Sequence, residues 1–70
     1  MDAVDIEPLY RSGDRIVVSS RSGDPLAQHY EGATGAVVAC FADGERFGCE
    51  VLLDDERLVE LSERDLLPDV

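Results

Sequence analysis

The sequence predicts an all-β domain, a small five-stranded barrel with one late 3₁₀ or helical turn. Four runs of β-branched or alternating apolar residues are separated by turn signals, and no run has the 3.6-residue period of an amphipathic helix. The chain has 70 residues, the size of one domain. Short strands that follow one another through tight turns pack as a barrel or a two-sheet roll.

The first half of the chain is expected to hold two strands and a long connection. Residues 1–12 lack periodicity and are interpreted as an N-terminal extension to a domain over 13–70. Residues 14–20 are rich in Val and Ile after a Gly-Asp pair, which predicts the first strand. Residues 21–33 contain glycines, a proline and polar residues, and predict a loop of a length that is often functional. The second strand is expected over 34–42.

The third strand has the clearest pattern in the chain. Over residues 46–53, Phe, Cys, Val and Leu alternate with Gly, Glu and Leu, so one face is apolar. The preceding Asp43-Gly44 pair predicts a hairpin. A four-residue loop over 43–46 would place Cys40 opposite Cys49, whereas a two-residue loop would place Phe47 opposite Cys40, and the sequence leaves both registers open. Both phenylalanines of the chain are expected in the core.

The last part of the chain predicts a fourth strand, a helical turn and a short fifth strand. Residues 57–62 form the fourth strand, with Val59 and Leu61 facing inward. Ser62, with Asp65 three residues later, is typical of a capping box that begins one helical turn. A short fifth strand or an extended tail is expected over 67–70.

These segments together resemble the SH3-like small barrels of bacteria, including the KOW-type domains. The resemblance lies in residues 13–18 (Gly-Asp-Arg-Ile-Val-Val), 32–38 (Gly-Ala-Thr-Gly-Ala-Val-Val), 43–44 (Asp-Gly) and 66–68 (Leu-Leu-Pro). It covers most of the chain and implies the fold, because glycines and β-branched residues specify strands and turns rather than a chemistry.

The ligands of these families do not transfer to this chain. KOW domains that contact RNA usually carry basic residues near the glycine-rich turn, where this sequence has Glu31, Asp43 and Glu45. SH3 domains that bind polyproline have a shelf of aromatic residues, commonly with Trp, and this chain has no Trp. The resemblance therefore implies a fold without its usual partners.

The charge of the chain excludes further classes of partner. Sixteen Asp and Glu against six Arg, with no Lys, give a formal net charge of −10. Affinity for nucleic acid comes mainly from cationic side chains, so direct binding of nucleic acid is not expected, and anionic lipid would also be repelled. No run of about 18 apolar residues is present, so no membrane span is expected. The chain is interpreted as cytoplasmic. In a reducing compartment Cys40 and Cys49 are interpreted as buried thiols, with a disulfide between them as the alternative.

Catalysis, cofactors and metals are not expected either. His29 and Cys40 are a possible base and nucleophile, but Cys40 falls in an apolar strand, where a thiol is unreactive. No Cys-x-x-Cys pair indicates zinc. The acidic turn Asp54-Asp55-Glu56 lacks the spacing of a calcium loop and is interpreted as solvated.

The candidate binding residues surround that acidic turn. Leu52 and Leu58 fall out of phase with the apolar faces of their strands and flank the same turn. A bulge could re-phase a strand and put both in the core. Alternatively they meet on the outer face as an apolar spot rimmed by Glu50, Asp54 and Glu60. We predict that a protein with a basic surface binds here, with these contact residues: Leu52, Leu58, Asp54, Asp55 and Glu56, and second Tyr30 from the long loop.

The sequence therefore predicts a non-enzymatic acidic module that binds protein, as a subunit or accessory factor of a larger assembly. Carboxylates would steer a basic partner to it. One alternative is a KOW-like domain associated with a ribosomal or transcription complex. Another is an acidic mimic of nucleic acid that inhibits a DNA-binding protein.

Overall fold

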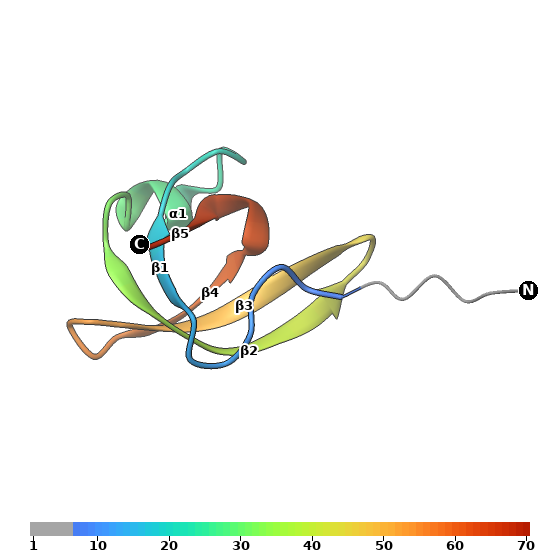
Figure 1. Ribbon diagram of the computed structural model, residues 1–70. Coiled ribbons are helices and arrows are strands. Elements are labelled where there is room, and N and C mark those ends of the chain that lie inside the picture. Colours follow the sequence, from blue (N-terminus) through green and yellow to red (C-terminus); the bar gives the residue numbers. More distant parts are fainter. Residues whose placement is uncertain (1–6) are drawn as a thin grey trace, which may run out of the picture.

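The computed structural model describes residues 7–70 as five antiparallel strands in one sheet, with two short helical segments (Figure 1). The elements in chain order are β1 (Arg15–Val18), α1 (Pro25–His29), β2 (Thr34–Asp43), β3 (Arg46–Leu53), β4 (Leu58–Ser62), the 3₁₀ turn η1 (Glu63–Asp65) and β5 (Leu66–Pro68). The strand order is β4-β3-β2-β1-β5, so the first and last strands are neighbours. The predicted all-β class is confirmed at this level.

The β2–β3 hairpin has the register expected for the four-residue loop, although residues 43 and 46 also pair and only two residues lie between the paired ends. Asp43 pairs with Arg46 and Cys40 lies opposite Cys49. Gly44, the first residue between the paired ends, has a φ of 65°, a conformation that favours glycine. The strong turn signal therefore sets which side chains meet across the hairpin.

The core lies on one face of the curved sheet. Its buried apolar residues are Tyr10, Ile16, Val18, Ala27, Val37, Cys49, Val51, Leu53, Val59, Leu61 and Leu66. The inward positions predicted for β3 and β4 are thus confirmed. Tyr10 joins the core from the expected N-terminal extension, and its hydroxyl donates to the carbonyl of Leu66 at 3.0 Å. Residues 1–6 of that extension lie outside the described residues.

Neither phenylalanine belongs to this core, contrary to the expectation. Phe41 is 39% exposed, because β2 contains an irregularity between Val37 and Ala39 that turns the later residues over. Phe47 shares the inward face but is only half-buried. It lies near the tip of the β2–β3 hairpin, which extends beyond the other strands (Figure 1).

A short helix interrupts the long loop, which the sequence interpretation missed. In α1, the Asp24 carboxylate accepts a hydrogen bond from the backbone N–H of Leu26 at 3.1 Å, and Pro25 occupies the first turn. Ala27 packs into the core beneath it. No helix within residues 7–70 has the length and apolar character that crossing a membrane would need.

The predicted late turn is present, but only half of its expected cap. The Ser62 hydroxyl accepts from the backbone N–H of Arg64 at 3.3 Å, as an N-cap should. Asp65 is fully buried and does not reach back to Ser62. Its carboxylate accepts instead from the backbone N–H groups of Arg21 and Ser22, at 2.8 and 2.9 Å, and from the Ser22 hydroxyl at 2.7 Å. Asp65 thus ties the loop after β1 to the end of the chain.

Candidate functional site

The candidate site lies on the outer face of the sheet, opposite the core. Leu52 pairs with Leu58 across β3 and β4, and Glu50 pairs with Glu60 one row further along. We call these four residues the outer patch. Successive residues of a strand point to opposite faces, and Val51 between the two rows is fully buried. The outer patch therefore faces away from the core.

The two leucines of the outer patch are exposed. Leu52 is 44% and Leu58 57% exposed, so the alternative that places both in the core is wrong. The irregularity that could have re-phased a strand lies in β2, at Val38, while β3 and β4 pair without interruption from Gly48–Ser62 to Leu52–Leu58. An exposed apolar pair on a regular sheet face is a feature of interaction surfaces when polar residues surround it.

The glutamates of the outer patch oppose each other without a cation between them. Leu53 donates its N–H to the carbonyl of Arg57 at 2.8 Å, so the alternation of an antiparallel pair makes Glu50–Glu60 a non-hydrogen-bonded pair, in which side chains are closest. Like charges in that position destabilise a sheet. The two ion pairs found within residues 7–70 use other acids, Asp54 and Asp55. The pair would be stabilised by a cation from outside.

The side chain of Asp54 is held in place by hydrogen bonds from the first residues of β1 and β2. Its carboxylate accepts from both terminal nitrogens of Arg15, at 2.9 and 2.8 Å, and from the hydroxyl of Thr34. The hydrogen bond from Arg15 and then that from Thr34 lower the pKa of Asp54 to about 2. Asp54 thus links β1, β2 and the β3–β4 turn. This structural role is additional to the contact with a partner that the sequence predicts, which stays a prediction.

The other two acids of the turn are exposed at the edge of the outer patch. Asp55 accepts from the backbone N–H of Arg57 at 3.1 Å and lies 3.4 Å from its guanidinium Nε. Glu56 has a φ of 72° and donates its N–H to the carbonyl of Leu53 at 2.8 Å, which closes the turn. The turn is solvated as the sequence interpretation expects.

Tyr30, the predicted contact residue from the long loop, is brought to the same turn by an arginine. Arg57 donates from its guanidinium to the Tyr30 hydroxyl at 3.3 Å, which helps to raise the pKa of Arg57. Tyr30 is half-buried at the end of α1, where His29 packs edge-on against it at 4.7 Å between ring centroids. The structure therefore places Tyr30 beside the residue that precedes Leu58. Arg57, which makes this connection, was not among the predicted residues.

A hollow of about 220 Å³ lies beside Glu60. It adds Asp24, Phe41 and Asp43 to the site, and the sequence interpretation had not included them. Its lining residues are Asp24, Phe41, Asp43, Gly48, Glu60, Leu61 and Ser62. The Phe41 ring lies over Gly48, where a Cβ would come within 2.8 Å of its Cε2 atom. Asp24 and Asp43 make the hollow acidic. The pairing of an aromatic residue with glycine across the hairpin is the signal that could have identified Phe41.

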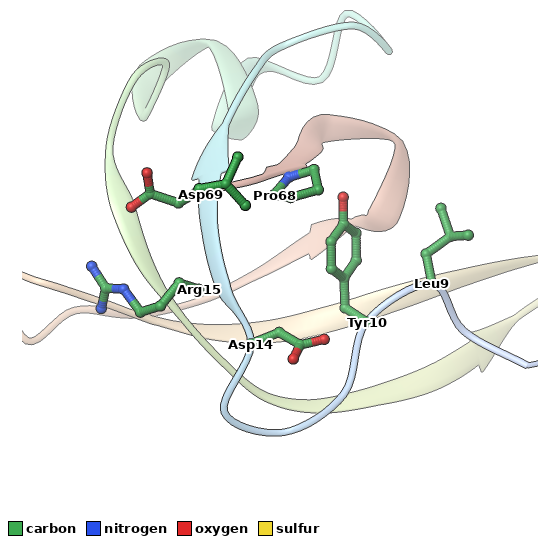
Figure 2. Close-up of a pocket in the computed structure, with 7 residues that line it drawn as sticks. Leu9, Tyr10, Asp14, Arg15, Pro68 and Asp69 are labelled. Atoms are coloured by element: carbon green, nitrogen blue, oxygen red, sulfur yellow. The ribbon is translucent and has the colours of Figure 1, made fainter.

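A second hollow, of about 360 Å³, lies between the N-terminal segment and β5 (Figure 2). The polar side chains of Tyr10, Asp14 and Arg15 in this hollow already have partners in the fold. Asp14 accepts from the backbone N–H of Arg11 at 2.9 Å. Arg15 points away from Tyr10 (Figure 2), and its guanidinium donates to Asp54 at 2.8 Å. These side chains are engaged in holding the fold together, so the outer patch is the better candidate for binding a partner.

The thiols and the imidazole are in separate environments. Cys49 is buried, and burial raises the pKa of its thiol, with a further rise from its hydrogen bond with Cys40. Cys40 is half-buried and donates to the carbonyl of Tyr10 at 3.3 Å. Both cysteines are free of disulfide bonds. Within residues 7–70, no three His, Cys, Asp or Glu side chains gather closely enough to hold a metal ion.

The outer patch, the acidic turn and the hollow beside Glu60 thus form one acidic surface with exposed apolar side chains. It spans β3, β4 and the turn between them, and the hollow adds residues of β2 and Asp24. Its chemistry fits binding to a cationic, partly apolar surface. Comparison of the chain with models of protein families, with curated proteins and with solved structures finds no match.

Proposed function

We propose that this protein is a non-enzymatic acidic module that binds another protein through the outer patch. The partner presents apolar side chains to Leu52 and Leu58 and a basic residue to Glu50 and Glu60. The module works in the cytoplasm as a subunit or accessory factor of a larger assembly, and a partner of opposite charge is steered to it by the net charge of −10.

The observation that carries the proposal is the exposed leucine pair beside the opposed glutamates. Roughly half of each leucine remains to be covered, at 44% and 57% exposure. Covering the remainder contributes about 1 kcal/mol for each leucine. A cation between the two glutamates would remove a repulsion that the free protein carries. Both terms favour the same partner chemistry.

The fold that we propose for this module is an SH3-like barrel. The strand order β4-β3-β2-β1-β5, with β5 back beside β1 and a 3₁₀ turn before β5, supports this proposal. In such a fold the outer face of β2, β3 and β4 is free for a partner, while the inner face holds the core. The fold itself says nothing about the identity of that partner.

The test is a comparison of captured proteins with three baits. Wild type, a Leu52→Thr/Leu58→Thr double variant and a Leu9→Thr control are each used on lysate, and captured proteins are identified by mass spectrometry. Leu9 is 72% exposed and lies outside the outer patch, so the control changes a leucine of similar exposure. Threonine keeps a β-forming residue in the strands. We expect wild type and the control to capture one or more basic proteins that the double variant does not capture.

Two results would contradict the proposal. The first is an identical set of captured proteins with all three baits. The second is a clear shift of RNA or DNA by the wild-type protein in a gel at low salt, which would favour a KOW-like domain that contacts nucleic acid. If the captured protein binds DNA, and added DNA displaces it from the wild-type bait, the acidic-mimic alternative would be favoured instead.

A further inference from the structure

The two ends of the sheet differ in their capacity to accept another strand. At the β5 end, no outward-facing N–H of the described residues is free for pairing. The Leu66 carbonyl accepts from the Tyr10 hydroxyl at 3.0 Å, the Leu66 N–H donates to Glu63 in the preceding turn, and Pro68 has no N–H. An edge strand that offers no free outward N–H is a poor template for pairing. This end of the sheet is therefore blocked.

The β4 end is open. Within residues 7–70, β4 pairs with β3 alone. The hydrogen bond from Leu53 to the carbonyl of Arg57 sets the alternation, so residues 59 and 61 bond to β3, and Leu58 and Glu60 direct their N–H and C=O groups away from the sheet. No hydrogen bond to these outward groups is present in the described part of the chain. Leu58 and Glu60 thus offer a pairing site of two alternate residues.

The side chains of these same two residues belong to the outer patch. A strand added at this edge would place its own side chains beside Leu58 and Glu60 on the outer face, because paired residues point to the same face. The row through Leu52 and Leu58 is apolar, and the row through Glu50 and Glu60 is acidic. Asp24 and Asp43 line the hollow beside Glu60 and add negative charge on this side of the acidic row. The incoming strand must therefore carry an apolar residue and a basic residue two positions apart.

We infer that the open β4 edge accepts an extended segment of the partner as an additional antiparallel strand. In that orientation the residue opposite Glu60 precedes the residue opposite Leu58, so the segment reads basic, any residue, apolar from its N-terminus. Main-chain hydrogen bonds to β4 give affinity, and the two side chains give specificity. This inference rests on the proposed function and specifies how the partner is bound. A second copy of this chain is the poorer occupant, because each copy has a net charge of −10.

The probe is a fluorescent nine-residue peptide with a central Arg-Thr-Ile and neutral Ser and Thr flanks. Its affinity is measured by anisotropy at low salt, and its site by NMR chemical shifts of the protein amides. We expect the Leu58 and Glu60 amide signals to shift and their exchange with solvent to slow. A peptide with Ile-Thr-Arg in its centre places Ile opposite Glu60 and Arg opposite Leu58. It should bind about tenfold more weakly.

N-methylation of the peptide separates strand addition from simple surface contact. A methyl group on the Arg or the Ile nitrogen removes an N–H that points toward β4 and should weaken binding about tenfold. The same methyl group on the central Thr, whose N–H points away from β4, is the matched control and should leave the affinity within about twofold. Equal effects at the three positions would overturn strand addition, while the proposed function would stand if the Leu52→Thr/Leu58→Thr variant loses the peptide.

Protein variants test the basic position. Glu60→Gln should weaken the Arg-Thr-Ile peptide by about fivefold, whereas Glu45→Gln, which makes the same change of charge in the β2–β3 turn, should have little effect. Equal effects of the two variants would contradict recognition at Glu60. Absence of any shift at β4 with either peptide would overturn the inference, and the capture experiment would still decide the proposed function. If the NMR signals of β4 shift with protein concentration alone, a second copy of this chain occupies the edge. That result would overturn the inference that a basic segment of a partner binds there.

Discussion

Asp65 shows how one side chain ties together segments that are far apart in sequence. Burial opposes its ionisation, but the hydrogen bonds from Arg21 and Ser22 outweigh this effect and lower its pKa. A carboxylate with a pKa below that of the unfolded chain stabilises the fold at neutral pH. The stabilisation is present above the unfolded pKa of about 3.9 and is lost as the pH falls through the native pKa.

We expect Asp65→Asn to lower the free energy of unfolding by about 1–3 kcal/mol at pH 7, because an amide nitrogen would face donors where an oxygen accepts now. The difference from wild type should shrink as the pH falls below about 4. Urea unfolding at pH 7 and at pH 3 measures both quantities. Asp69→Asn, at an exposed position after β5, is the control and should change little. A constant difference across this pH range would contradict the charged role of Asp65.

The two cysteines should differ in reactivity. Cys49 is buried and the pKa of its thiol is raised by that burial, so it holds little thiolate at pH 8. We expect iodoacetamide to modify Cys40 first, and Cys49 only when the protein unfolds. Peptide mass spectrometry after timed labelling gives the two rates, and concentrated guanidinium chloride should make them similar. Equal rates in the native protein would show that Cys49 is accessible.

At the scale of elements, sequence patterns located strands where alternation was regular. The third strand was predicted over 46–53, and β3 has those bounds, because apolar and polar residues alternate along it. α1 was missed because five residues are too few to show a helical period. The irregularity at Val38 leaves no mark in the sequence, so Phe41 was assigned to the wrong face.

The candidate site was predictable to a similar degree. The out-of-phase positions of Leu52 and Leu58 identified both residues, but only the register of β3 and β4 decides between core and outer face. The link from Arg57 to Tyr30 spans 27 residues and depends on where α1 packs. A sequence pattern describes neighbours along a strand, whereas these contacts depend on how the strands and α1 pack in space.

Two glycines of the β2–β3 pair should respond differently to alanine. At Gly35 a Cβ would lie 2.5 Å from the backbone oxygen of Leu52, and backbone cannot move away without breaking the sheet. At Gly48 the nearest atom belongs to the exposed ring of Phe41, which can rotate away. We expect Gly35→Ala to cost about 3 kcal/mol and Gly48→Ala less than about 1 kcal/mol. Chemical denaturation of both variants tests this order, and similar losses would contradict it.

For the whole molecule, the excess of negative charge should make stability depend on salt. Sixteen acids face six arginines in a chain of 70 residues, so the folded state carries self-repulsion. Salt at 0.1 M screens charges beyond about 10 Å. We expect the melting temperature to rise between 0 and about 0.3 M NaCl. A variant with Asp43, Glu45, Glu56 and Glu60 replaced by their amides should show a smaller rise. A flat or falling melting temperature in wild type would contradict net repulsion.

The pairing of β1 with β5 also determines when the sheet can be completed during synthesis. Val17 at one end of the chain pairs with Leu67 near the other, whereas the β2–β3 hairpin needs only residues close in sequence. Local pairs form quickly, and distant pairs must wait for the whole intervening chain. On the ribosome, β1 would therefore remain without one of its two neighbours until residues 66–68 emerge. The acidic, strongly self-repelling nascent chain would keep neighbouring copies apart during that interval.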